Sequence, residues 1–131
     1  MIADKKLSIL IVDDDKFLLN MYSVKFEKEG YAVATVTNTK EAFDKLREGY
    51  RPDILILDIV MPDMDGLMFL EMLQKEKLIP TTVVVLLTNQ SQESDIQRAK
   101  ELGAAGYIVK ATTIPSEVLR EVLEIYEKHK K

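Results

Sequence analysis

The amino-acid sequence predicts an α/β protein in which a doubly wound parallel sheet of five strands carries helices on both faces. Five short apolar stretches alternate with five stretches of helical spacing along the 131 residues. Such alternation is typical of a parallel sheet with crossover helices. The central stretch, residues 54–57, is an unbroken apolar run, as expected for a strand buried on both sides.

The expected strands differ in how apolar they are, which predicts their places in the sheet. Residues 32–36 are the weakest of the five and are expected nearer a sheet edge, whereas residues 82–87 are the most β-rich run. The strands are expected over residues 7–12, 32–36, 54–57, 82–87 and 107–109.

The first helix is expected over residues 16–29, ending at Gly30, where a left-handed residue is wanted. Helical spacing places Phe17, Met21 and Val24 on one apolar stripe, with Leu18 and Tyr22 beside it.

Capping residues, glycines and a proline mark the expected ends of the other four helices. Asn38 is expected to cap the second, with Glu41 as its capping-box partner, and Gly49 to end it. The others are expected over residues 67–77, over residues 91–102 before Gly103, and from Pro115 onward. The side chains expected to face the core are Ala42, Phe43, Leu46, Leu70, Leu73, Val118, Leu119, Val122, Ile125 and Tyr126.

Length and composition exclude several classes of protein and kinds of binding site. The chain fits one domain over residues 1–131, and its net charge of −4 argues against a nucleic-acid-binding surface. It has no cysteine, which excludes disulfides and thiolate metal sites and fits a cytoplasmic protein. No apolar segment approaches the ~20 residues of a membrane span, and the first residues lack the apolar stretch of a signal peptide.

Functional side chains stand at the ends of four expected strands. They are Asp13 and Asp14 after the first strand, Asp58 after the third, Thr88 after the fourth and Lys110 after the fifth. Right-handed crossovers bring the carboxyl ends of parallel strands to one edge of the sheet. We therefore expect these side chains to form one site.

The three carboxylates of that site repel one another, because two such charges ~4 Å apart cost on the order of 4 kcal/mol at an effective dielectric near 20. They could share protons or bind a cation, and oxygen ligands alone favour Mg²⁺. Lys110 and the Thr88 hydroxyl would complete a site for a phosphoryl group, with a carboxylate as the nucleophile. Alternatively, Asp13, Asp14 and Asp15 could simply lie at a solvent-exposed helix N-terminus, where acidic residues are favoured. Asp15 itself is expected to cap that helix rather than bind metal.

The ordered set of motifs resembles the receiver domain of two-component response regulators over the whole chain. The residues that carry the resemblance are Asp13, Asp14 and Asp15, the segment from Asp58 through Pro62 to Gly66, Thr88, and the run from Tyr107 to Lys110. The resemblance implies a flavodoxin-like fold with strand order 2-1-3-4-5. It also implies a Mg²⁺-dependent switch that catalyses only its own phosphorylation and dephosphorylation.

The resemblance assigns the acidic residues their roles. Asp58 would accept a phosphoryl group from a histidine kinase or phosphotransfer protein. Asp14 and Asp58 would bind Mg²⁺ directly and Asp13 largely through water, with the backbone carbonyl of Val60 completing the protein ligands.

The remaining roles concern switching. Thr88 and Lys110 would bind the phosphoryl oxygens, and Tyr107 would change rotamer with Thr88. Asn89 stands where the family usually has a small residue, and it would narrow access to Asp58. Ala111 replaces the usual proline, so we expect a trans bond after Lys110.

The resemblance also implies a docking face for a downstream protein target, made by residues 91–102, 107–109 and 115–126. It leaves open whether the chain is a stand-alone receiver, similar to those of chemotaxis and phosphorelays, or a domain of a longer protein.

Two other functions compete with the switch. A Mg²⁺-dependent phosphohydrolase of the haloacid dehalogenase kind needs a second acid two residues after its nucleophile, where this chain has Val60. A docking module that needs no phosphorylation would tolerate Asn89 and Ala111 but has no use for the intact set of acids, Thr88 and Lys110. Asp63 and Asp65 lie in a segment that fails the calcium-loop pattern, so Asp65 is expected in a turn or cap.

Overall fold

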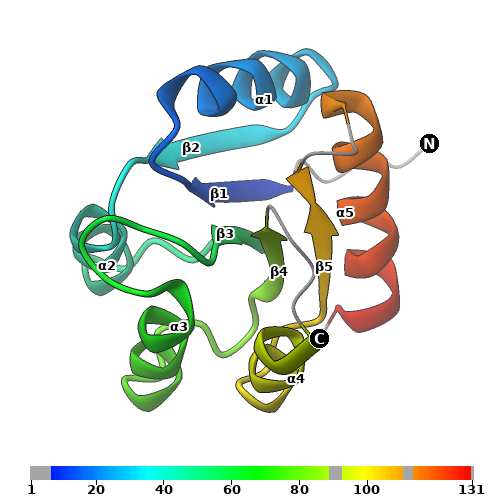
Figure 1. Ribbon diagram of the computed structural model, residues 1–131. Helices are drawn as coiled ribbons and strands as arrows, with labels where there is room; N and C mark the ends of the chain where they lie inside the picture. The colour runs from blue at the N-terminus through cyan, green and yellow to red at the C-terminus, as the bar shows by residue number, and fades with distance from the viewer. Residues whose placement is uncertain (1–6, 89–92, 111–113, 131) are drawn as a thin grey trace.

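Five parallel strands form one sheet in the order β2-β1-β3-β4-β5, which confirms the expected fold and strand order (Figure 1). The computed structural model describes residues 7–88, 93–110 and 114–130. The strands are β1 (Ser8–Val12), β2 (Ala32–Val36), β3 (Ile54–Asp58), β4 (Val83–Thr88) and β5 (Gly106–Val109). The weak strand β2 lies at an edge, as predicted, and the apolar strand β3 lies at the centre.

Helices α1 to α4 connect the strands and α5 follows the last strand, and the side chains of the strands divide between two helical layers. The helices are α1 (Lys16–Lys28), α2 (Thr39–Arg47), α3 (Gly66–Lys75), α4 (Glu93–Glu101) and α5 (Pro115–His129). Helices α1 and α5 cover one face of the sheet, and α2, α3 and α4 cover the other (Figure 1). None of the helices in the described ranges is long and apolar enough to cross a membrane.

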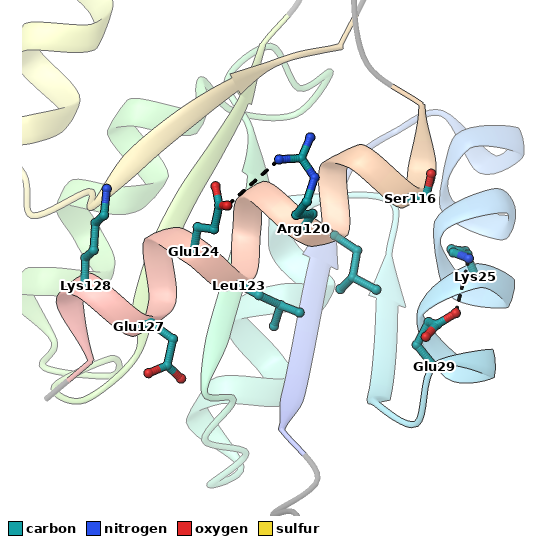
Figure 2. Close-up of a pocket in the computed structure, with 9 residues that line it drawn as sticks. Lys25, Glu29, Ser116, Arg120, Leu123, Glu124, Glu127 and Lys128 are labelled. Carbon is teal, nitrogen blue, oxygen red and sulfur yellow. Dashed lines mark hydrogen bonds and ion pairs between the residues drawn. The ribbon is translucent and has the colours of Figure 1, made fainter.

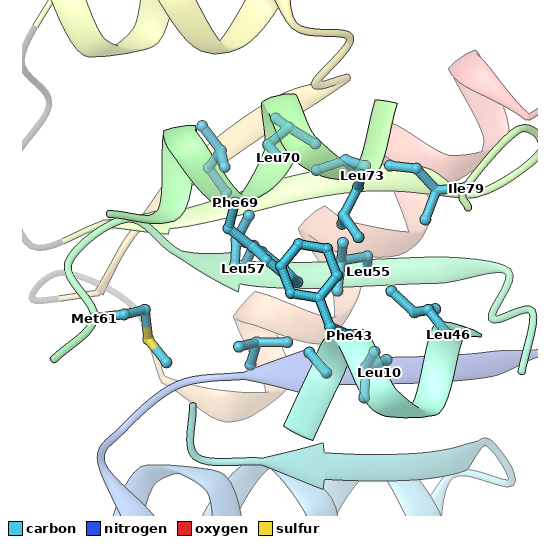
Figure 3. Close-up of a cluster of buried hydrophobic side chains, with 14 of the residues drawn as sticks. Leu10, Phe43, Leu46, Leu55, Leu57, Met61, Phe69, Leu70, Leu73 and Ile79 are labelled. Carbon is cyan, nitrogen blue, oxygen red and sulfur yellow. The ribbon is translucent and has the colours of Figure 1, made fainter. Parts of the chain in front are cut away.

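Successive residues of the central strands point to opposite layers, as the pleat requires. Leu10, Leu55 and Leu57 pack toward α2 and α3, where Phe43 and Phe69 meet edge to face with ring centroids 4.8 Å apart (Figure 3). The isoleucines between those leucines pack toward α1 and α5. Both faces of β3 are therefore buried, which explains its unbroken apolar run.

Helix α1 buries the side of Tyr22 rather than the stripe of Phe17, Met21 and Val24. Leu19, Tyr22 and Phe26 are buried, whereas Phe17 is 73% exposed and Val24 is 59% exposed. Helix α1 has apolar side chains on more than one stripe, so spacing alone could not choose between them. Packing against the sheet selects the stripe that contains Tyr22 and Phe26, whose rings stack.

Most helix boundaries follow the predicted signals. Asn38 accepts a hydrogen bond from the Glu41 backbone N–H at 2.9 Å, and its own side-chain amide donates to the Glu41 carboxylate at 3.2 Å. Helix α3 ends at Lys75, two residues earlier than expected, because Lys77 takes the left-handed conformation at φ 56°. The predicted start of α4 at Ser91 lies outside the described residues.

Candidate functional site

The carboxyl ends of the strands meet at one edge of the sheet, as predicted. The register pairs Val12 with Leu57 and Asp58 with Leu87, so Asp13, Asp58 and Thr88 follow neighbouring strand ends. Oxygen atoms of Asp13, Asp14 and Asp58 lie within 4.8 Å of one another. Asp13 and Asp58 are buried, at 0% and 4% exposure, whereas Asp14 is exposed.

Lys110 lies between the two buried carboxylates. Its Nζ is 2.7 Å from Asp13 Oδ2 and 3.1 Å from Asp58 Oδ2, and it donates a hydrogen bond to the latter. The contact with Asp13 is the shorter of the two ion pairs. Asp13 Oδ2 is a buried side-chain oxygen without a hydrogen bond, and none other is found in the described ranges. The lysine therefore offsets part of the acidic charge.

Burial and charge shift the pKa values of this pair. Burial raises the pKa of Asp58 above its ordinary value, the Asp13 charge adds to the rise, and Lys110 opposes it. Burial favours a lower pKa for Lys110, but the short contacts and charge interactions with Asp13 and then Asp58 outweigh burial, so the pKa of Lys110 is raised. Lys110 is consequently charged at neutral pH.

The backbone around Asp58 is tightly shaped by the turn into α3. Asp58 Oδ1 accepts a hydrogen bond from the Val60 N–H at 3.2 Å, and Ile59 O accepts one from the Gly66 N–H at 2.7 Å. A Cβ at Gly66 would clash with the backbone of Asp58 and Ile59. Only glycine lets α3 begin this close to the end of β3.

The first turn of α1 holds the other acids in place. Asp13 Oδ1 accepts a hydrogen bond from the Asp15 N–H at 2.9 Å, and Asp15 Oδ1 accepts one from the Leu18 N–H at 3.1 Å. Asp15 is therefore the N-cap of α1, as predicted, and Asp14 is left exposed beside the buried pair. Asp65 likewise caps α3 through the Leu67 N–H, at 2.7 Å.

Thr88 and Tyr107 lie on adjacent strands, two register positions apart. Thr88 is buried and pairs in register with Val109, while Tyr107 pairs with Leu86 and is 40% exposed. The predicted roles of Asn89 and of the bond before Ala111 fall on residues outside the described ranges.

One residue near the site was missed by reasoning from the sequence. Asp63, in the loop between β3 and α3, accepts hydrogen bonds from the Thr39 N–H, the Thr39 hydroxyl and the Lys40 N–H. The partners are at least 23 residues apart, and the sequence carries no short-range signal that links them.

The acidic cluster suits a hard divalent cation. It offers carboxylate oxygens from three residues, and one of them is a buried oxygen without a hydrogen bond. Mg²⁺ prefers such donors and keeps several waters, which the exposed side of Asp14 leaves room for. The residues present therefore fit Mg²⁺.

A groove of about 780 Å³ lies between α1 and α5, away from the acidic cluster (Figure 2). Leu119 and Leu123 line it together with charged side chains that are already paired, such as Lys25 with Glu29. It contains no residue of the strand-end cluster.

Comparisons with known proteins agree with this geometry. The family described as the response regulator receiver domain matches residues 9–124. The response regulator SaeR of Staphylococcus aureus is 36% identical over 124 residues, covering 94% of this chain and 52% of SaeR. The alkaline phosphatase synthesis transcriptional regulatory protein PhoP of Bacillus subtilis is 33% identical, covering 89% of this chain and 47% of PhoP. The chain thus spans about half the length of these curated relatives.

Solved structures show the same fold along their whole length. The chemotaxis response regulator CheY4 of Vibrio cholerae superposes with a TM-score of 0.83 at 28% identity, covering 92% of this chain and 99% of that one. A CheY-like receiver domain protein from Methanospirillum hungatei gives a TM-score of 0.84 at 29% identity, covering 95% and 96%.

Proposed function

The chain belongs to the receiver domain family of two-component response regulators, and we propose that it is a switch operated by phosphorylation of Asp58. Receiver domains are signalling modules that interact with histidine kinases and downstream effectors. The observation that carries the proposal is the placement of Lys110 between the buried carboxylates of Asp13 and Asp58, beside Asp14.

In the proposed reaction Asp58 is the nucleophile. One of its carboxylate oxygens attacks the phosphorus of a phosphohistidine on a kinase or phosphotransfer protein, and the phosphorus–nitrogen bond of the donor breaks. The product is an acyl phosphate, and the donor histidine leaves as a neutral imidazole after taking up a proton. Since the attacking group is the carboxylate, the raised pKa of Asp58 predicts that the reaction slows as the pH falls toward the acidic range.

Two positive groups would neutralise the phosphoryl oxygens beside Asp58, a bound Mg²⁺ and the ammonium of Lys110. Asp13, Asp14, Asp58 and the Val60 backbone carbonyl would hold Mg²⁺, which supplies positive charge beside the phosphoryl oxygens when bound. Lys110 already approaches Asp58 Oδ2 at 3.1 Å, so its ammonium can neutralise a phosphoryl oxygen with only a small change of position.

The signal would then pass to the edge of the sheet. Thr88 follows the phosphoryl group, and Tyr107, on the neighbouring strand, changes rotamer in response. That change would alter the face made by α4, β5 and α5, where a downstream protein binds. Phosphorylation can shift this face only by its differential affinity for the two conformations.

Phosphorylation by a small-molecule donor tests the proposal. Acetyl phosphate with Mg²⁺ should add one phosphoryl group per chain by intact-protein mass spectrometry, and EDTA should block the addition. A docking module would gain no mass, and a phosphohydrolase would turn over many phosphoester molecules per chain. Wild type that stays unmodified with Mg²⁺ and a competent histidine kinase would contradict the proposal.

A further inference from the structure

We propose that Asp63 is a positioning residue for the phosphorylation site, because its carboxylate ties the β3–α3 loop to the N-terminus of α2 and so holds the Val60 backbone in place. This inference rests on the proposed function of the Asp58 site. Asp63 itself touches neither Asp58 nor Lys110 through any described hydrogen bond or ion pair.

The contact joins two segments that are distant in the sequence. One Asp63 oxygen lies 2.9 Å from Thr39 Oγ1 and 3.1 Å from Thr39 N, and the same oxygen lies 3.3 Å from Lys40 N. The other oxygen lies 3.3 Å from Thr39 N. Thr39 is 2% exposed, so the loop is attached to a buried position of α2.

Asp63 supplies hydrogen-bond acceptors to backbone N–H groups in the first turn of α2. The first N–H groups of a helix have no partner within the helix, and a carboxylate there is also favoured by the helix dipole. Asn38 satisfies only the Glu41 N–H, and Asp63 satisfies those of Thr39 and Lys40. These hydrogen bonds lower the pKa of Asp63 although burial opposes them, so the carboxylate is charged at neutral pH.

The rest of the loop is attached to the neighbouring strand β4 and to its own two ends. Ile59 N–H donates to Leu87 O on β4 at 3.4 Å. Val60 N–H donates to Asp58, Gly66 N–H donates to Ile59, and Asp65 caps α3. Among the described hydrogen bonds of residues 60–65, those of Asp63 reach α2, whereas those of Asp65 reach α3. Met61, beside Val60, is buried in the core at 8% exposure. Without the Asp63 bonds, the segment that carries the Val60 carbonyl would keep this apolar contact but would lose its polar attachment to α2.

Replacing a residue that orients a metal ligand usually lowers metal affinity by about 10-fold to 100-fold, and we expect an effect of this order at Asp63. Asp63→Ala should raise the Kd for Mg²⁺ by about tenfold or more and slow phosphorylation by acetyl phosphate at subsaturating Mg²⁺. Asp63→Asn keeps an acceptor oxygen for the same N–H groups and should recover most of the affinity.

Asn38→Ala is the matched control, because it removes the other N-cap of the same helix without touching the β3–α3 loop. Both variants should lower the melting temperature, since each loses a cap of α2. Only Asp63→Ala should weaken Mg²⁺ binding, measured by titration calorimetry. Equal Mg²⁺ affinities in wild type and Asp63→Ala, or an equal loss in Asn38→Ala, would overturn the proposal.

Amide hydrogen exchange in the metal-free protein separates this inference from the proposed function. The Val60 and Gly66 amides should exchange faster in Asp63→Ala than in Asn38→Ala if Asp63 holds the loop. Equal exchange in the two variants would remove Asp63 as an anchor. Absence of Mg²⁺ binding in wild type itself would instead contradict the proposed function and leave the exchange result valid.

Discussion

Replacing Lys110 by methionine removes the one cation that the structure places between Asp13 and Asp58. The two ion pairs, at 2.7 Å and 3.1 Å, each correspond to about 5 to 6 kcal/mol of Coulomb attraction at an effective dielectric near 20. The desolvation of the ammonium offsets several kcal/mol of that attraction, and breaking a buried pair typically costs about 3 to 5 kcal/mol. We expect Lys110→Met to lower the free energy of unfolding by about 3 kcal/mol at neutral pH.

The loss should depend on pH in a defined direction. The pKa of Lys110 is raised in the folded protein. The stability that the charged lysine contributes is therefore fully present below pH 10.5, its ordinary pKa, and is lost only as the pH rises through the pKa of the folded state. The pKa of Asp58 is raised despite Lys110, and the variant removes the group that opposes the rise. Above pH 3.8, the ordinary pKa of an aspartate, the folded variant therefore binds more protons than its unfolded chain. Acidification from neutral pH toward 3.8 should then reduce the difference in the free energy of unfolding between the variant and wild type.

Urea unfolding followed by circular dichroism measures this effect at each pH. The control is Lys40→Met, because Lys40 pairs with Asp44 at a similar distance, 3.2 Å, but is 82% exposed. Exposed pairs of this kind contribute about 0.3 to 0.5 kcal/mol. If Lys110→Met loses no more stability than Lys40→Met, or loses the same amount at pH 7 and under acidic conditions, Lys110 does not stabilise the buried carboxylates in this way.

Two further predictions concern the metal and the switch. Mg²⁺ should raise the melting temperature of wild type by mass action, and Asp14→Ala should abolish most of that rise; an equal rise in both proteins would remove Asp14 from the metal site. Thr88→Ala should still accept a phosphoryl group, but the amide chemical-shift changes over residues 93–110 and 114–126 should shrink; an undiminished response would remove Thr88 from the coupling.

The element order could be predicted because local chemistry decided it. The buried strands are continuous apolar runs, and Asn38, Gly30 and Gly49 mark helix ends that the structure confirms. The inner face of α1 could not be predicted, because Phe17 and Phe26 are equally apolar and only the sheet decides which is covered. The strand order followed from the family resemblance, and the structure confirms it.

The site could be predicted where its residues stand at strand ends. Asp13, Asp58 and Lys110 follow strands whose carboxyl ends must share one edge, so topology alone brings them together. From the sequence, shared protons or a bound metal ion would reduce the repulsion among the carboxylates; in the folded protein Lys110 also does so, by pairing with Asp13 and Asp58. Asp63 was missed because its bonds to α2 depend on loop geometry, which no short motif records.

Borohydride trapping tests directly whether Asp58 carries the phosphoryl group. Borohydride reduces an aspartyl phosphate to homoserine, a change that peptide mass spectrometry assigns to a single position. After treatment with acetyl phosphate and Mg²⁺, we expect homoserine at position 58 and unmodified aspartate at Asp13 and Asp14. Homoserine at either of those positions, or at none while the intact protein has gained a phosphoryl group, would contradict the assignment of Asp58 as the acceptor.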